Sequence, residues 1–137
     1  MEDLKKALKK EQLTCIVSSC GHIYKEKNKG ILPLLHFIEQ GVLREGIVVD
    51  KVIGKAAAML MIYGGVKKVH ACMISEHALT MFRQHHIPIS YDVLVPYIIN
   101  RSGTGMCPME ESVLACEDIE EAYHILCKKA ESMKKAG

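Results

Sequence analysis

Short apolar runs alternate with polar breaks along the chain and divide it into helices and strands. Residues 1–10 mix leucines with lysines and acids, a pattern that predicts a short amphipathic helix. Residues 14–19 and 22–25 flank a Cys-Gly turn, and they predict the two strands of a β-hairpin. Residues 32–40 repeat apolar side chains at helical spacing, with a proline in the first turn, and predict the next helix.

The longest helical pattern follows an apolar stretch at residues 46–49. The Asp50 carboxylate can accept hydrogen bonds from the free amides of a first turn, so we expect a helix that begins there and runs to Tyr63. Gly64-Gly65 supplies its left-handed cap. Three successive alanines, at 56–58, let this helix pack closely on a sheet, which predicts that it is the central one.

The second half continues the alternation. Residues 69–74 predict a buried strand, and Ser75 caps a helix over residues 76–85. A short strand is expected at 89–91. Residues 95–100 fit a short helix or a strand, and we favour the helix.

The chain ends with a loop, a short helical segment and a long helix. A glycine-containing loop at 101–107 precedes Pro108, which starts a brief helical segment, and Asp118 caps a final helix over residues 119–135. This succession predicts an α/β fold, a three-layer α-β-α sandwich on a mixed sheet, formed by a single domain over residues 1–137.

Composition narrows the class of protein. The 137 residues are 49% hydrophobic and 25% charged, with a net charge of +2, as in an ordinary soluble domain. A charge so near neutral, without alternating aromatic and basic residues, favours no nucleic-acid partner. The N-terminus does not resemble a signal peptide, and no run approaches the roughly 20 apolar residues of a membrane span. We therefore expect a cytoplasmic protein without a membrane partner.

Cysteines and histidines do not form a metal motif. The six cysteines are irregularly spaced and include no Cys-x-x-Cys, so we expect thiols rather than a disulfide framework. His70 and Cys72 share one strand face, but they would need ligands from elsewhere. We expect neither a metal nor a cofactor.

The first candidate site is the expected helix start at Asp50. Lys51 and Lys55 lie four residues apart, and Gly54 removes a side chain, so an anionic ligand could approach the backbone. A purely structural interpretation is equally open. In it, the aspartate caps the helix, the two lysines are solvated, and the glycine makes room for a packed neighbour.

The second candidate is Ser75-Glu76-His77, where a strand gives way to a helix. Ligands of open α/β sheets gather at the carboxyl ends of strands. Ser75 could donate to a ligand, and Glu76 or His77 could exchange protons. Helix capping alone also explains Ser75.

The third candidate joins Asn100, Arg101 and Cys107. Arginine suits bidentate recognition of a carboxylate or phosphate. The intervening glycines let the loop close, and a thiol at a helix start can have a lowered pKa. A surface loop with an incidental thiol is the structural alternative.

Several of these motifs together resemble those of the DUF1893 (TM1506-like) family of small prokaryotic proteins of unknown function. The matching residues are Asp50 to Ala58, Ser75-Glu76, Tyr91-Asp92, Asn100-Arg101 and Cys107-Pro108-Met109-Glu110. The resemblance implies a cytidine-deaminase-like fold. Zinc deaminases carry His-x-Glu and Pro-Cys-x-x-Cys at two helix starts, which by order correspond here to residues 50–55 and 75–78. Neither motif is present, so the resemblance implies a pocket without the zinc chemistry.

The leading hypothesis is a metal-independent deaminase-like domain that binds, and could act on, a small anionic metabolite or nucleotide. Lys51, Gly54, Lys55, Asn100 and Arg101 would bind it, and Asp50, Ser75, Glu76 and Cys107 are the catalytic candidates. A non-catalytic binding or regulatory module is one alternative. A structural protein that forms homo-oligomers through Leu4, Leu8 and helical surfaces is another.

Overall fold

A computed structural model gives the fold of the chain and describes residues 1–28, 31–98 and 108–136. Within these ranges the elements follow in the order α1 (Glu2–Lys10), β1 (Cys15–Ser19), β2 (His22–Glu26), α2 (Leu32–Glu39), β3 (Ile47–Ile53), α3 (Lys55–Gly64), β4 (Lys68–Ser75), α4 (Glu76–Gln84), β5 (Ile89–Val95), α5 (Pro108–Ser112) and α6 (Ile119–Ala136).

The strands form one mixed sheet in the order β2-β1-β3-β4-β5. β1 pairs antiparallel with β2 and β3, whereas β3, β4 and β5 run parallel. The three parallel strands therefore end at the same edge of the sheet, and α3 and α4 begin directly after two of them. Ligands of open α/β folds bind at such an edge.

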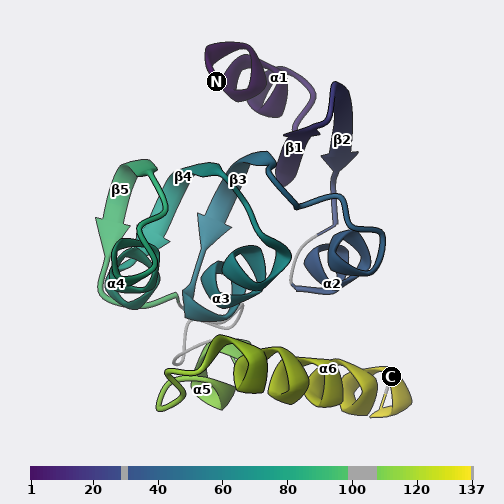
Figure 1. Ribbon diagram of the computed structural model, residues 1–137, viewed down its shortest axis with the longest axis vertical. Coiled ribbons are helices and arrows are strands. Elements are labelled where there is room, and N and C mark those ends of the chain that lie inside the picture. Colours follow the sequence, from purple (N-terminus) through teal and green to yellow (C-terminus); the bar gives the residue numbers. More distant parts are fainter. Residues whose placement is uncertain (29–30, 99–107, 137) are drawn as a thin grey trace.

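Helices lie on both faces of the sheet, as expected for a three-layer α/β fold (Figure 1). α1 covers one face, over β1 and β3, while α2, α3 and α4 cover the other. α6 packs on the outside of α3, where Tyr63 and Tyr123 stack with ring centroids 4.1 Å apart. None of the helices in the described ranges is long and apolar enough to cross a membrane.

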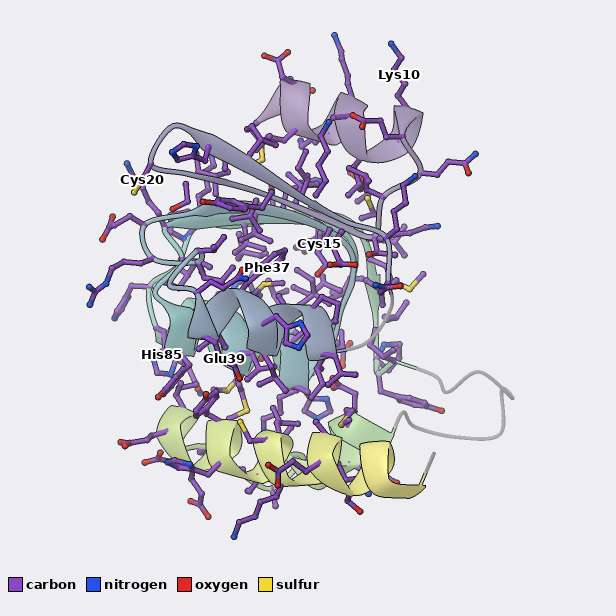
Figure 2. All side chains as sticks on the ribbon, turned by 90° about the vertical axis from the view of Figure 1, so that its right-hand side faces the viewer. Lys10, Cys15, Cys20, Phe37, Glu39 and His85 are labelled. Carbon is purple, nitrogen blue, oxygen red and sulfur yellow. The ribbon has the colours of Figure 1, made fainter. Side chains whose placement is uncertain are left out.

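The main core lies between the sheet and the three helices below it. Val48, Val69 and Ala71 of the sheet meet the alanines and methionines of α3, which packs against α2, α4 and α6 and is therefore apolar on nearly all sides. Figure 2 shows Cys15 and Phe37 inside this layer and Lys10 directed away from it.

A smaller core lies under α1. Leu4 and Leu8 pack against Ile16 and Val49 on the other face of the sheet. In the folded chain these two leucines are buried, so they do not form an exposed surface for self-association.

Most expected elements are confirmed, including the hairpin, the left-handed cap at Gly65 with φ of 86° and the Ser75 cap of α4. The expected helix start at Asp50 is wrong. Residues 47–53 are strand β3, because parallel pairing with β4 continues through Ile53, and Gly54 is the residue that precedes α3. Tertiary pairing of these β-branched residues outweighs the capping preference of the aspartate.

The expected short helix over 95–100 is also wrong for its described part. β5 continues to Val95, which pairs with Ser75, and residues 96–98 are not helical. Residues 99–100 lie outside the described ranges.

Candidate functional site

The start of α3 is capped by a carboxylate that comes from far along the chain. Glu110 of α5 is buried and accepts hydrogen bonds from the backbone amides of Lys55 at 2.6 Å and Ala56 at 3.0 Å. Gly54 makes this possible, because a Cβ at position 54 would overlap the Glu110 carboxylate. The glycine does admit an anion to the backbone, as expected from the sequence, but the anion is the chain's own side chain.

Burial raises the pKa of Glu110, against the lowering effect of the amides of Ala56 and Lys55. The Glu110 carboxylate, which forms the cap, therefore lies in surroundings that disfavour its negative charge. Its hydrogen bonds compensate part of that cost.

Lys55 is buried, with a side chain only 3% exposed, and its ammonium points toward the segment after α5. Nζ donates to the Leu114 carbonyl at 2.7 Å and lies 3.4 Å from Oε1 of Glu117. The Glu117 side chain is 70% exposed. The lysine thus has one firm backbone contact and one long ion pair with a solvated partner.

Lys51 lies apart from Lys55. It is exposed on strand β3, where its amide donates to the Thr14 carbonyl at 2.8 Å. Because the helix begins only at Lys55, the two lysines do not share a helix face.

Asp50 lies in the interior of the sheet, between its strand neighbours Cys15 and Ala71. Burial raises the pKa of Asp50 to about 7, against hydrogen bonds from the amides of Val52 and Lys51 and from the Cys15 thiol. Burial also raises the pKa of Cys15 well above its usual value. The pair is enclosed by β1, β3 and β4 and lines neither of the two cavities described below.

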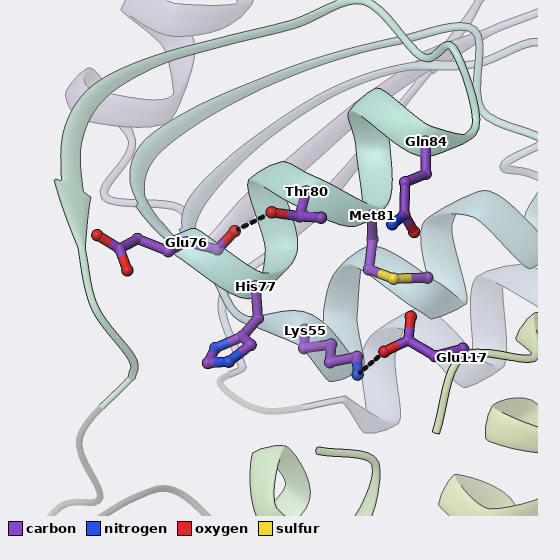
Figure 3. Close-up of a pocket in the computed structure, with 7 residues that line it drawn as sticks. All are labelled: Lys55, Glu76, His77, Thr80, Met81, Gln84 and Glu117. Atoms are coloured by element: carbon purple, nitrogen blue, oxygen red, sulfur yellow. Dashed lines mark hydrogen bonds and ion pairs between the residues drawn. The ribbon is translucent and has the colours of Figure 1, made fainter. Parts of the chain in front are cut away.

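Ser75 and Glu76 occupy different environments. Ser75 is fully buried, and its hydroxyl accepts from the Ala78 amide at 3.1 Å, so it acts as the cap of α4. Glu76 is exposed, and its carboxylate points toward β5 (Figure 3).

A cavity of about 340 Å³ lies between α4 and the segment that precedes α6 (Figure 3). Six of its seven lining residues have polar or charged side chains; the lining is formed by Lys55, Glu76, His77, Thr80, Met81, Gln84 and Glu117. Lys55, Glu76 and His77 were candidates from the sequence, whereas Thr80, Gln84, Met81 and Glu117 were not. The spacing of residues 77, 80 and 84 along one helix face was the signal that could have indicated the first two.

A second hollow, of about 430 Å³, is apolar and lies at the carboxyl ends of β3, β4 and β5. Val52 and Met73 pair across neighbouring strands, and the chain after β5 completes the wall. The lining residues are Val52, Met73, Val95, Pro96, Tyr97 and Ile98.

A polar cluster joins β4 to β5. Nδ1 of buried His70 lies 2.7 Å from the Ser90 hydroxyl, and Nε2 lies 3.5 Å from the Asp92 carboxylate. Burial raises the pKa of Cys72, and the nearby Asp92 carboxylate adds to that rise. Among the described residues, no three His, Cys, Asp or Glu side chains are placed to hold a metal ion.

The loop candidates Asn100, Arg101 and Cys107 lie outside the described residues. Of the candidates that the structure describes, Lys55, Glu76 and His77 line one cavity, whereas Asp50, Ser75 and Lys51 do not belong to its lining.

Comparison with known proteins identifies a family of unknown function and a similar solved structure. The profile of a domain of unknown function, DUF1893 (TM1506), matches residues 3–130. The crystal structure of the DUF1893 family protein TM1506 from Thermotoga maritima is similar, with 30% identity and a TM-score of 0.87 over 93% of this chain and 88% of that one. No curated protein matches.

Proposed function

The chain belongs to the DUF1893 family, and we propose that it binds a small anionic metabolite in the cavity beside Lys55. The observation that carries the proposal is that the Lys55 side chain is buried without a close carboxylate partner. Its ammonium is buried, and the carboxylate beside it is a solvated side chain at 3.4 Å. A buried cation with so weak a counter-ion favours an anionic ligand.

Ligand binding would exchange one anion for another. A carboxylate or phosphate that enters the cavity can replace Glu117 at Nζ of Lys55, while the contact to the Leu114 carbonyl stays in place. Glu117 loses little by moving away, because its side chain is already largely in water. His77 and Gln84 supply further hydrogen-bonding groups in the same wall.

The size of the cavity favours a small ligand. Its volume of about 340 Å³ is near the lower end of the roughly 300–1,000 Å³ found for ligand pockets. A small carboxylate or phosphate metabolite therefore fits the described walls better than a whole nucleotide does. The start of α3 is not proposed as the anion site, because Glu110 already binds its amides.

A catalytic role is the alternative, and it would rest on His77. Its imidazole lines the cavity near Lys55, where it could donate or accept a proton. The absence of His-x-Glu and Cys-x-x-Cys from the sequence argues against zinc deamination. The cytidine-deaminase-like fold remains a prediction from the family resemblance.

The test is ligand-induced stabilisation across inorganic phosphate, small dicarboxylates, sugar phosphates and mononucleotides, followed by calorimetric titration. We expect at least one small anion to raise the melting temperature of the wild type and of Lys51→Met, but not of Lys55→Met. Lys51→Met is the matched control, since it removes an exposed lysine elsewhere on the surface.

For each variant, the measured quantity is the shift of its melting temperature when ligand is added. This shift reports ligand binding even where the substitution itself lowers the melting temperature. His77→Ala provides a second variant at an exposed position. Equal shifts in wild type and Lys55→Met would refute the site. Turnover of a bound anion that is lost in His77→Ala would favour the catalytic alternative over a non-catalytic module.

A further inference from the structure

The exposed apolar side chains concentrate at one edge of the sheet. Of the ten large hydrophobic residues exposed in the described ranges, four lie on β5 or directly after it, and Met73 on β4 and Val52 on β3 continue the row that starts at Val93, so the distribution is not a scatter. These six are Val52, Met73, Tyr91, Val93, Leu94 and Tyr97.

The backbone at this edge is open for pairing. β5 forms hydrogen bonds with β4 on one side, and no strand of the described chain lies on its other side. Charged residues commonly protect such edges. β5 has one charged residue, Asp92, and its carboxylate is already 3.5 Å from His70. Within the described ranges, no backbone group pairs with the outer edge of this strand, and apolar side chains flank it.

Charges on α4 indicate which partner would fit. α4 runs beside β5 (Figure 1), with Glu76 at its start and Arg83 two turns later, both exposed. If two copies are related by a two-fold axis at the β5 edge, their α4 helices run antiparallel. Glu76 of each copy then lies near Arg83 of the other, so the charges are complementary at both ends.

We propose that the β5 edge binds a second copy of this chain, by antiparallel pairing of the two β5 strands into one continuous sheet. The second copy supplies everything the edge requires: a free strand, apolar side chains and the reversed order of charges on α4. Centring the pair on Val93 places Asp92 opposite Leu94 of the second copy. That register avoids the repulsion of two opposed aspartates.

The first experiment measures mass by light scattering and sedimentation on the full chain, whose monomer mass is 15.3 kDa. We expect a dimer for the wild type and a monomer for Val93→Lys. The matched control is Ile23→Lys, which places the same charge on exposed strand β2 at the opposite edge and should remain dimeric. Circular dichroism checks that each variant is folded.

The second experiment changes Glu76 and Arg83 of α4. Both side chains are exposed, so substituting them leaves the core packing intact. Glu76→Arg and Arg83→Glu should each weaken dimerisation by about tenfold or more, since like charges would meet. The double variant should recover most of the loss. A wild type that stays monomeric up to millimolar concentration overturns the proposal. So does a folded Val93→Lys dimer, or a double variant no better than the single ones.

Discussion

The carboxylate of Glu110 occupies the space that a side chain at Gly54 would fill. It caps the first turn of α3 from a segment more than fifty residues later, by accepting the amides of Lys55 and Ala56. A glycine between β3 and α3 thus makes room for the contact that joins α5 to the start of α3. The backbone at Gly54 is ordinary, with φ of −101°, so its role is steric rather than conformational.

Gly54→Ala should destabilise the protein by about 1–3 kcal/mol, because the added methyl displaces a buried carboxylate and leaves two helix amides without an acceptor. Urea unfolding measures the loss. On a Glu110→Ala background the same substitution should cost much less, because the clash is then gone. Additive costs in this double-mutant cycle would contradict the contact.

Glu110→Gln should also destabilise the fold by about 1–3 kcal/mol. The amide oxygen can accept one of the two backbone amides, but the amino group opposes the other. The control is Glu111→Gln, an exposed neighbour in α5 that should change stability little. Equal stability of the two variants in urea unfolding would argue against the Glu110 cap.

Asp50 makes stability fall as pH rises. Burial raises the pKa of this carboxyl to about 7, so the folded state keeps its proton above the pH at which the unfolded chain loses it. Between about pH 4 and 7, Asp50 is ionised in the unfolded chain but still protonated in the folded one, and this difference stabilises the unfolded chain as pH rises. Stability is therefore greatest below this window and decreases through it, by on the order of 4 kcal/mol for this group.

Asp50→Asn removes that titration, so its stability should vary less with pH than that of the wild type. Urea unfolding at several pH values from 4 to 8 measures the difference between the two curves. Comparison with the wild type isolates Asp50 from other groups, including Glu110, whose raised pKa acts in the same direction. Parallel curves would show that Asp50 ionises at its usual pH.

Substitutions of Lys55 and of Glu117 should differ in how much they lower the free energy of unfolding. Lys55→Ala removes a buried stem and the donor to the Leu114 carbonyl, and we expect a loss of about 2–3 kcal/mol. Glu117→Gln should cost less than about 1 kcal/mol, because the ion pair is long and solvated. Chemical denaturation of both variants tests this order, and a larger loss for Glu117→Gln would reverse the view of Glu117 as a replaceable counter-ion.

The sequence predicted local structure well where local rules decide it. Ser75 caps α4, Asp118 Oδ1 accepts the Glu121 amide at the start of α6, and Gly65 closes α3. It failed at Asp50, because a cap preference worth about 1 kcal/mol competes there with a full parallel strand pairing. The role of Glu110 was also hidden, although the residue belonged to a motif shared with the family.

The sequence by itself determined most of the elements, the mixed α/β class and the family, since periodicity, caps and motifs are encoded over short stretches. Only the tertiary structure decided which polar groups meet. Glu110 and Glu117 reach the start of α3 from distant positions, and Asp50 is enclosed by strands on both sides. Burial and pairing depend on contacts between remote segments, so residue type and spacing could not reveal them.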